Sequence, residues 1–332
     1  MKLVKVGLVG AGYLGAIHAK LLAALGETWV GLFDLDLEKA AQVAAQWNRR
    51  VFGTLESLLD EVDGVIVASA TSSHYEIAKR ALERGKHLFL EKPMTSTVAE
   101  AEEIVALSQE KGLTLQVGHV ERFNRAIRAL GQKAPRPQFI EAHRLTQFRP
   151  RGTDVAVVLD LMIHDLDLIL MLCGEYPAHV EAVGVAVISE AADIANARLN
   201  FPSGAVANIT ASRISANPMR KMRLFAADSY ISLDLATGRA EIYRLAKPGE
   251  ETLPGTMALG QVEKGAVKRH ILYEAPEAPE ANAIEMEQAE FIRAMREGVR
   301  PTVRGEDGLA ALRLASEILS KMGTVEVATG RE

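Results

Sequence analysis

A run of three spaced glycines near the start of the chain is the first pattern that points to chemistry. Residues 10–15 read Gly-Ala-Gly-Tyr-Leu-Gly, and they follow a short apolar stretch and precede a helix-like one. In that context the first glycine permits a tight turn, the second lets the backbone approach a pyrophosphate, and the third lets a helix pack on a strand. We therefore expect a dinucleotide at this helix N-terminus, with contacts from Gly10, Gly12, Tyr13, Leu14 and Gly15.

An acidic residue, Asp34, follows the next apolar stretch, about 20 residues after the glycines. A carboxylate in this place accepts hydrogen bonds from the adenosine ribose and disfavours a 2′-phosphate. No arginine follows it directly, since the next residues are Leu35 and Asp36. We expect NAD as the cofactor, with NADP less favoured. The alternative is that Asp34 only caps the helix expected from residue 37.

A lysine stands where a further apolar strand ends, in Glu91-Lys92-Pro93. Ligands of a doubly wound sheet bind beyond the carboxyl ends of its strands, which places Lys92 at the functional edge. A lysine beside a reacting hydroxyl can polarise it, or accept its proton if burial lowers the lysine pKa. The alternative is an exposed lysine before a turn proline.

Residues 155–172 form an almost continuous apolar run with polar residues at helical spacing. Asp160, His164 and Asp167 fall at i, i+4 and i+7, on one face of the expected helix. Buried polar groups require partners, so this face predicts a cavity in which Asp160 orients His164 as a general base. The alternatives are a satisfied core histidine and a metal site. No third ligand follows a pattern, and we expect no metal.

Several arginines precede this helix in an acidic chain, and arginines pair well with phosphate oxygens. They are Arg144, Arg149 and Arg151, with Arg122 and Arg213 as further candidates. We expect substrate contacts from Arg122, Asn124, Arg149 and Arg151. The alternative is a solvated basic loop.

The apolar pattern predicts an α/β fold with two domains. Short apolar strands at 3–9, 29–33, 64–68, 86–90 and 114–117 alternate with helices at 13–25, 37–47, 76–84 and 98–111, which is typical of a parallel, doubly wound sheet. Longer strands at 179–188, 194–201, 205–214, 222–227, 229–235 and 240–246, then helices at 285–297 and 308–322, predict a mostly antiparallel open sheet with helices on one face. We expect a Rossmann domain over residues 1–120 and an α/β domain for substrate binding and oligomerisation over 121–332.

Composition excludes several classes of protein. The 332 residues have a net charge of -5, which disfavours a protein that coats nucleic acid or an anionic membrane. The single cysteine, Cys173, excludes an intrachain disulfide and a cysteine-based zinc site. No apolar run reaches the roughly 20 residues of a membrane span, and no signal peptide is evident. We expect a cytoplasmic enzyme.

Together these residues resemble the Gfo/Idh/MocA oxidoreductase family over almost the whole chain. The motifs that carry the resemblance are residues 10–15, Ser69–His74 as Ser-Ala-Thr-Ser-Ser-His, Gly85-Lys86-His87 before Glu91-Lys92-Pro93, Asp160-x-x-x-His164, and Gly305-Glu306-Asp307-Gly308. The chain departs at Ala70, where the family often has proline.

The resemblance implies site residues and an assembly. Lys92, Asp160 and His164 would line the nicotinamide, with His164 accepting the proton and Lys92 orienting the hydroxyl. The resemblance further implies a cis Lys92–Pro93 bond and a homodimer or homotetramer formed through the open sheet. The other implied cofactor contacts are Ser69, Thr71, His74, Glu91 and Lys92.

Residues 117–124 and 160–165 resemble the branch that includes UDP-N-acetylglucosamine 3-dehydrogenases. The expected function is therefore NAD-dependent oxidation of a secondary hydroxyl of a sugar, nucleotide sugar or cyclitol. The alternatives are a non-catalytic NAD-binding regulator or redox sensor, and a reductase of the same fold with a non-sugar substrate. Fold alone does not name a substrate.

Overall fold

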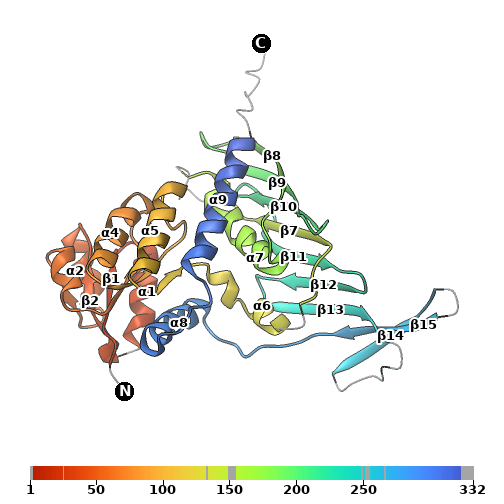
Figure 1. Cartoon of the computed structure of the whole chain (residues 1–332), viewed down its shortest axis with the longest axis horizontal. Helices are drawn as coiled ribbons and strands as arrows, with labels where there is room; N and C mark the ends of the chain where they lie inside the picture. The colour runs from red at the N-terminus through yellow and green to blue at the C-terminus, as the bar shows by residue number, and fades with distance from the viewer. Residues whose placement is uncertain are drawn as a thin grey trace, which may run out of the picture. The chain divides into compact units, whose positions relative to one another are not determined.

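The chain forms two compact units, neither of them continuous in sequence (Figure 1). The computed structural model describes residues 3–24, 26–131, 134–148, 155–247, 250, 255–264 and 267–322. The first unit contains the chain up to Phe123 together with Ala281–Arg313, and the second contains Asn124–Glu280 and the segment from Leu314. This division differs from the single boundary expected near residue 120, because the chain returns to the first unit late in the sequence.

The first unit is built on a six-stranded sheet with the order β3-β2-β1-β4-β5-β6. Every neighbouring pair is parallel. This is the order of a dinucleotide-binding doubly wound sheet, in which the strand order reverses beside β1, and it confirms the expected Rossmann fold. The strands are β1 (Val6–Val9), β2 (Trp29–Phe33), β3 (Arg50–Val51), β4 (Gly64–Val67), β5 (His87–Leu90) and β6 (Leu115–Val117).

Helices connect these strands, and local capping defines where several of them begin. Thr54 and Thr97 each form a capping box at the start of a helix, which satisfies backbone N–H groups that the helix leaves unpaired. The short elements β3 and α3 were not expected, and α4 begins at Thr71 rather than at residue 76, because its first turn is rich in serine and threonine. The elements are α1 (Tyr13–Ala23), η1 (Gly26–Thr28), α2 (Leu37–Ala45), α3 (Leu55–Leu59), α4 (Thr71–Glu83), α5 (Val98–Glu110), η2 (Val120–Phe123) and α8 (Ala283–Glu297). The first part of α9 (Gly305–Lys321), up to Arg313, also belongs to this unit.

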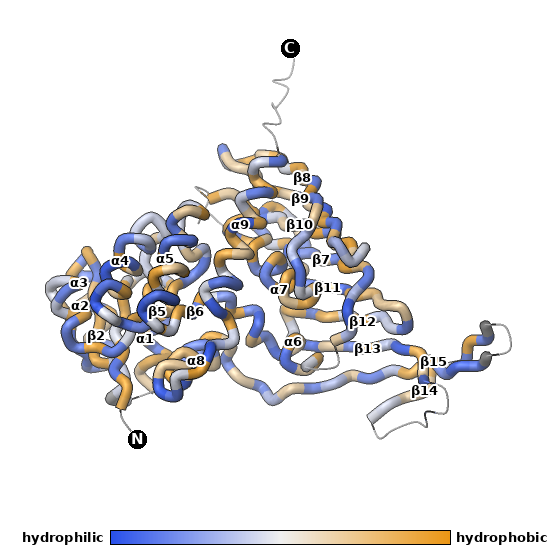
Figure 2. The backbone as a smooth tube through the Cα atoms, in the orientation of Figure 1, coloured by the Kyte–Doolittle hydropathy of each residue, from blue (hydrophilic) through white to orange (hydrophobic). Residues whose placement is uncertain are grey.

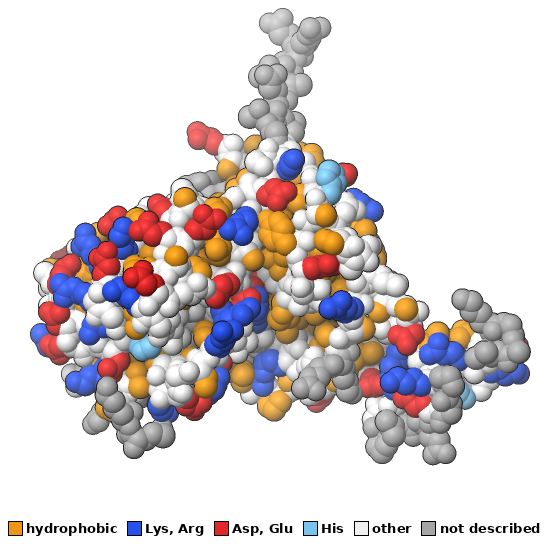
Figure 3. Space-filling view, in the orientation of Figure 1, with side chains coloured by type: hydrophobic (Ala, Val, Ile, Leu, Met, Phe, Trp, Pro, Cys, Tyr) orange, Lys and Arg blue, Asp and Glu red, His pale blue; other side chains and the backbone are white. Residues whose placement is uncertain are grey.

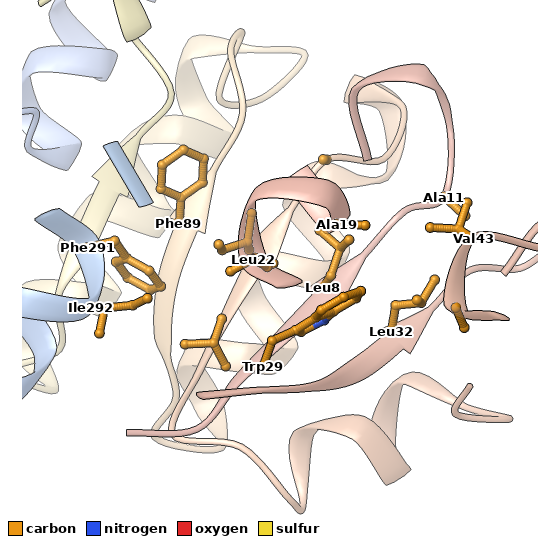
Figure 4. Close-up of a cluster of buried hydrophobic side chains, with 14 of the residues drawn as sticks. Leu8, Ala11, Ala19, Leu22, Trp29, Leu32, Val43, Phe89, Phe291 and Ile292 are labelled. Atoms are coloured by element: carbon orange, nitrogen blue, oxygen red, sulfur yellow. The ribbon is translucent and has the colours of Figure 1, made fainter. Parts of the chain in front are cut away.

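One buried cluster joins α1 and α8 to the sheet (Figure 4). Leu8, Leu22, Trp29 and Phe89 are buried in it, together with Phe291 from α8. The Phe89 and Phe291 rings meet edge to face with centroids 5.9 Å apart. Each such side chain contributes roughly 1.5–3 kcal/mol when it is withdrawn from water, so α8 belongs to the core of this unit.

Two glycines at the start of α9 allow this helix to lie directly against β6. A Cβ on Gly305 would lie 2.4 Å from a side-chain carbon of Leu115, and one on Gly308 would lie 2.6 Å from Val117. Between them, Asp307 accepts a 2.8 Å hydrogen bond from the backbone N–H of Arg304. The closing glycine motif is therefore a packing motif.

The surface of the first unit mixes charges of both signs (Figure 3). Exposed pairs such as Lys79–Glu103 and Arg84–Asp60, both 2.7 Å, link neighbouring helices. Exposed pairs of this kind contribute about 0–1 kcal/mol each. The buried cluster, rather than these pairs, therefore supplies most of the stability.

The second unit is built on a nine-stranded sheet with the order β14-β15-β13-β12-β11-β7-β10-β9-β8. Among the described residues of this sheet only β7 and β10 pair in parallel, so the expected mostly antiparallel sheet is confirmed. The central strand β7 and the strands β14 and β15 were not expected. The strands are β7 (Phe139–Leu145), β8 (His179–Val185), β9 (Ile194–Asn200), β10 (Val206–Ser212), β11 (Met219–Phe225), β12 (Ser229–Asp234), β13 (Arg239–Leu245), β14 (Thr256–Lys264) and β15 (Val267–Glu274).

A buried ion pair attaches a helix to the middle of this sheet. Arg144 of β7 donates to Asp165 of α7 (Ile163–Cys173) through two bonds, 2.7 and 3.0 Å long. Both side chains are almost fully buried. The pair explains why β7 escaped prediction, because a charged residue occupies a core-facing position of the strand. Figure 2 shows the hydrophobic character of α7, and α6 (Arg125–Leu130) is a second helix of this unit.

The expected helix over residues 155–172 is divided into two parts. It begins with a π-helical turn, η4 (Val158–Met162), and continues as α7, which ends at Gly174 in the left-handed conformation. Such π turns are rare and often occur at functional sites. No helix within the described ranges is long and apolar enough to cross a membrane.

A buried carboxylate secures the segment that leads into η4. Asp193 accepts bonds from the backbone N–H groups of Val187, Ile188 and Ser189, at 2.8, 2.6 and 2.9 Å. Arg213 lies 3.8 Å from the same carboxylate and also donates to the Val155 carbonyl. Burial alone would raise the pKa of Asp193, but the backbone donors hold it well below its usual range.

Replacing Asp193 with Asn should destabilise the protein in a pH-dependent way. An aspartate titrates near pH 3.9 when unfolded, and its lowered folded pKa means that the stabilisation is present above that pH and is lost as the pH falls. We expect Asp193→Asn to lower the free energy of unfolding by about 2–3 kcal/mol at pH 7, and by less at pH 3.5, in urea titrations. Asp60→Asn, in an exposed pair, is the control. An equal deficit at both pH values would contradict the prediction.

Candidate cofactor and catalytic site

A cavity of about 940 Å³ opens in the first unit where β1, β2 and β4 end. This is the point at which the strand order reverses, where open α/β sheets bind ligands. The volume lies within the range of small-molecule sites. Six of the residues predicted from the sequence line it: Gly10, Gly12, Tyr13, Leu14, Asp34 and Ser69.

The three glycines of the turn have different physical roles. Gly10 has φ +104°, and a Cβ there would lie 2.7 Å from the backbone of Ala68. A Cβ on Gly15 would lie 2.1 Å from the Gly10 carbonyl oxygen, whereas one on Gly12 would meet nothing within 4 Å. The protein itself requires Gly10 and Gly15, while Gly12 leaves open the space that a pyrophosphate would occupy.

Asp34 holds the glycine turn in place from the end of β2. One carboxylate oxygen accepts a 2.6 Å bond from the N–H of Ala11, and the other accepts a 2.8 Å bond from the N–H of Asp36. Asp36, not Asp34, caps α2 through the N–H of Lys39. The alternative in which Asp34 merely caps this helix is therefore wrong, and its carboxylate stands at the cavity as a dinucleotide site requires.

The far end of the cavity contains residues that the motifs did not identify. Leu35 is 89% exposed, and Thr54, Leu55 and Ile77 share the lining with it. Apolar side chains around a cavity suit a flat, weakly polar group such as a nucleotide base. The capping box at Thr54 was a detectable signal for this wall, but α3 is too short to stand out in the apolar pattern.

The Ser69–His74 segment turns from β4 into α4. The Ser69 and Ser73 hydroxyl oxygens are 2.8 Å apart, and Thr71 is the first residue of α4. Ala70 has φ -67° and ψ 141°, which is the backbone conformation that proline adopts. The departure from proline at this position therefore preserves the path of the chain.

His74 is buried, outside the described lining of the cavity, and links two loops. Its two ring nitrogens lie 3.1 Å from the carbonyl oxygens of Ser69 and Pro93. Burial lowers the pKa of His74, although the two carbonyls oppose this effect. The structure thus gives His74 a role in connecting the serine loop to the Lys-Pro loop, and the cofactor contact that the resemblance implied stays a prediction.

The Glu91-Lys92-Pro93 loop leaves β5 with a cis Lys92–Pro93 bond, as the resemblance implied. Lys92 is half-buried, whereas Glu91 is buried. The Glu91 carboxylate accepts a 2.8 Å bond from His18 and a 3.2 Å bond from the N–H of Lys92. Glu91 is therefore engaged within the protein, and His18, which follows no motif considered above, is its partner.

In the second unit, Asp160 lies on the π turn and His164 on the first turn of α7. Both side chains are half-buried, whereas Asp167 is fully buried. The expected three-residue polar face is therefore reduced to the pair Asp160 and His164. In the described part of the chain, no group of three or more His, Cys, Asp or Glu side chains is placed to hold a metal ion.

The candidate substrate residues have different surroundings. Arg122 lies 3.4 Å from the Thr302 carbonyl and 3.5 Å from Asp307 in the first unit. Asn124, in the second unit, caps α6 and donates to the Leu235 carbonyl. Arg149 and Arg151 lie outside the described residues.

Two other arginines of the expected phosphate cluster are used inside the second unit. Arg144 binds Asp165, and Arg213 binds Asp193 and the Val155 carbonyl. Both guanidinium groups are almost fully buried. Their contacts support the sheet and the start of η4, so neither is available as a surface phosphate contact in the way the sequence suggested.

Gly12→Ala and Gly15→Ala should separate cofactor binding from stability. The Gly12→Ala methyl group enters the cavity, so NAD affinity measured by calorimetry should fall about tenfold or more while the melting temperature changes little. The Gly15→Ala methyl group collides with the Gly10 carbonyl, so the melting temperature should fall by several degrees, as about 1–3 kcal/mol of overpacking does. Unchanged NAD affinity in Gly12→Ala would contradict this assignment.

Comparison with known proteins agrees with the geometry of both units. Residues 4–119 match the model of an oxidoreductase family with an NAD-binding Rossmann fold, and residues 131–232 match the GFO/IDH/MocA C-terminal domain. A solved structure of UDP-N-acetylglucosamine 3-dehydrogenase from Acidithiobacillus ferrooxidans has a TM-score of 0.85 and 35% identity, covering 97% of this chain and 98% of that one.

Sequence relatives point the same way. The UDP-N-acetylglucosamine 3-dehydrogenase of Acidithiobacillus ferrooxidans is 40% identical over 269 residues, which is 81% of this chain and 85% of that protein. The myo-inositol 2-dehydrogenase of Thermotoga maritima is 26% identical over 329 residues, 93% of each chain. The resemblance is confirmed, and the cofactor is NAD. This chain belongs to the Gfo/Idh/MocA family and is an oxidoreductase that acts on CH–OH donors.

Proposed function

We propose that the protein oxidises one secondary hydroxyl of a sugar, a nucleotide sugar such as UDP-N-acetylglucosamine, or a cyclitol. The observation that carries the proposal is the half-buried pair Asp160 and His164, set at a π turn in an otherwise apolar helix. The pair brings a carboxylate and an imidazole to one stretch of helix, and an imidazole can accept the proton of a substrate hydroxyl. The names of the relatives, a nucleotide-sugar dehydrogenase and an inositol dehydrogenase, support the substrate class.

In the proposed reaction the alcohol loses a hydride from carbon and a proton from oxygen, and a ketone results. When bound, NAD supplies the hydride acceptor at C4 of its nicotinamide. His164 accepts the hydroxyl proton, Asp160 orients the imidazole of His164, and the Lys92 ammonium orients the hydroxyl oxygen. Ser69, Thr71 and the glycine turn hold the cofactor, and Glu91 and His74 shape the loops around it.

In this proposal, arginines that precede η4 in the sequence recognise a phosphorylated substrate. Arg144 and Arg213 are occupied in buried ion pairs, and Arg122 lies beside Asp307. Arg149 and Arg151 are therefore the proposed contacts to a diphosphate, because guanidinium groups bind phosphate oxygens in a bidentate manner. Arg122 and Asn124 are proposed to bind the sugar.

The reaction test combines a substrate panel with two variants. Purified protein and NAD should form NADH with at least one of UDP-N-acetylglucosamine, N-acetylglucosamine, myo-inositol and glucose. His164→Asn and Lys92→Met should each lower kcat by about 10²–10⁴-fold, the usual contribution of proton-transfer catalysis, with NAD affinity retained. His179→Asn, at an exposed histidine of β8, is the matched control and should keep full activity.

The outcomes of this test separate the alternatives. NADH formation with UDP-N-acetylglucosamine but not with the free sugar assigns the diphosphate a binding role. NAD binding without turnover of any substrate would instead favour a regulator. Full activity in Lys92→Met and His164→Asn would overturn the proposed chemistry.

We also propose that two copies associate through the exposed face of the nine-stranded sheet. Phe139, Phe225, Tyr230, Tyr243 and Tyr273 form a ladder of adjacent rings with centroids 5.0–5.6 Å apart. The ladder lies opposite the α7 face, because Phe139 alternates along β7 with the residues that face α7. Aromatic residues are enriched at interfaces, which favours a homodimer or a homotetramer. We propose that this assembly acts in the cytoplasm.

The assembly proposal predicts a change in mass when the ladder is charged. Tyr230→Glu should reduce a dimer or tetramer to a smaller species in light scattering coupled to size-exclusion chromatography, because a charge placed among apolar rings opposes association. Lys111→Glu, at an exposed position at the end of α5 in the first unit, serves as a charge-change control. A wild-type monomer at micromolar concentration would overturn the proposal.

A further inference from the structure

A buried polar cluster in the first unit lies directly behind the Lys-Pro loop. It consists of His18 from α1, Glu91 after β5 and Gln288 from α8, with exposed fractions of 0%, 6% and 0%. His18 Nε2 lies 2.8 Å from a Glu91 carboxylate oxygen, and Gln288 Nε2 lies 2.8 Å from His18 Nδ1. The three side chains thus form a chain of hydrogen bonds that ends at the residue before Lys92.

The direction of these hydrogen bonds follows from a second contact of Gln288. Its Nε2 also lies 3.2 Å from the backbone carbonyl oxygen of His18, and a carbonyl oxygen only accepts. The amide nitrogen therefore faces His18 and donates to Nδ1. In the neutral imidazole the proton then lies on Nε2, from which it is donated to Glu91.

The Glu91 carboxylate has little freedom in this arrangement. Its Oε1 accepts from His18, and its Oε2 accepts a 3.2 Å bond from the N–H of Lys92. The carboxylate also packs against Gly118, where a Cβ would lie 2.7 Å from Oε2. A buried carboxylate is costly unless it is bound in this way, so the bonds that satisfy Glu91 also define the backbone position from which Lys92 projects.

We infer that Gln288 and His18 are positioning residues for Lys92, acting through the Glu91 carboxylate. This inference rests on the proposed function, in which Lys92 orients the reacting hydroxyl. Gln288 and Glu91 together select the His18 tautomer, because the amide donates to Nδ1 and the carboxylate accepts from Nε2. His18 in turn orients Glu91, and Glu91 holds the Lys92 backbone. The returning helix α8 therefore contributes to turnover without touching substrate or cofactor.

Two pairs of variants test this inference. Gln288→Leu removes the amide that donates to His18 Nδ1, and Gln288→Glu keeps the shape but replaces the donor with an acceptor. His18→Leu removes the donor to Glu91, whereas His18→Gln keeps an amide N–H near the position of Nε2 and should restore much of the activity. We expect kcat to fall about 10–100-fold in Gln288→Leu, Gln288→Glu and His18→Leu, as misplacement of a catalytic group does, with NAD affinity changed less than threefold.

A packing control on the same helix distinguishes positioning from general destabilisation. Ile292→Val removes one methylene from a buried residue of α8 and should cost about 0.5–1.5 kcal/mol of stability with unchanged kcat. In a Glu91→Gln background, Gln288→Leu should cause little further loss of kcat, because both changes break the same chain of bonds. Two outcomes would show that Gln288 acts only through stability. In the first, Gln288→Leu lowers kcat by the same factor in the Glu91→Gln background as in the wild-type protein. In the second, Ile292→Val lowers kcat as much as Gln288→Leu does.

A second readout requires no substrate and therefore stands apart from the proposed function. In a ¹⁵N-histidine correlation spectrum of the NAD-bound protein at alkaline pH, His18 should show a protonated Nε2 and an unprotonated Nδ1. Gln288→Leu should shift the Nδ1 resonance, because it removes the hydrogen bond that this nitrogen accepts. A single Nδ1–H tautomer in the wild-type protein would overturn the inference, even if the protein oxidised no sugar; the expected tautomer with no turnover would instead place the failure in the proposed function.

Discussion

The close contact between the first turn of α1 and the end of β1 is the constraint on which the cofactor unit depends. The Gly10 carbonyl lies where a Cβ on Gly15 would be 2.1 Å away, so helix and strand meet with no side chain between them. Asp34 then ties the same turn to β2 through the N–H of Ala11. This close packing leaves the open space at Gly12 directly at the helix N-terminus, where an anion is favoured.

Buried charges place the other functional segments of the chain. Glu91 holds the Lys-Pro loop through His18 and Lys92, Arg144 holds α7 against β7 through Asp165, and Asp193 with Arg213 holds the entry to η4. Each charge is satisfied by several hydrogen bonds, and removing one partner would leave the other buried and unpaired. Polar contacts of this kind specify one arrangement of a loop more strictly than apolar packing does, because they depend on direction as well as on distance.

Much of the fold was predictable from local signals. The apolar runs of β2 and β4 and the glycine turn predicted the parallel sheet, since continuous apolar strands are typical of sheets covered on both faces. The strands β8 to β13 were expected from long strand-like stretches of sequence. In contrast, β7 was missed because Arg144 occupies a core-facing position, and β14 and β15 were missed because their surfaces carry many polar residues.

The sequence by itself determined the dinucleotide turn, the acidic residue after β2, the Lys-Pro loop and the Asp-His pair, because each depends on residues close together in the chain. Only the tertiary structure decided that Asp36 rather than Asp34 caps α2 and that a π turn interrupts the apolar helix. It also decided that Arg144 and Arg213 pair with buried carboxylates. The partnership of His18, Glu91 and Gln288 belongs to this second group. Its members are far apart in sequence, and only the packing of α1, β5 and α8 around one core brings their polar atoms within hydrogen-bonding distance.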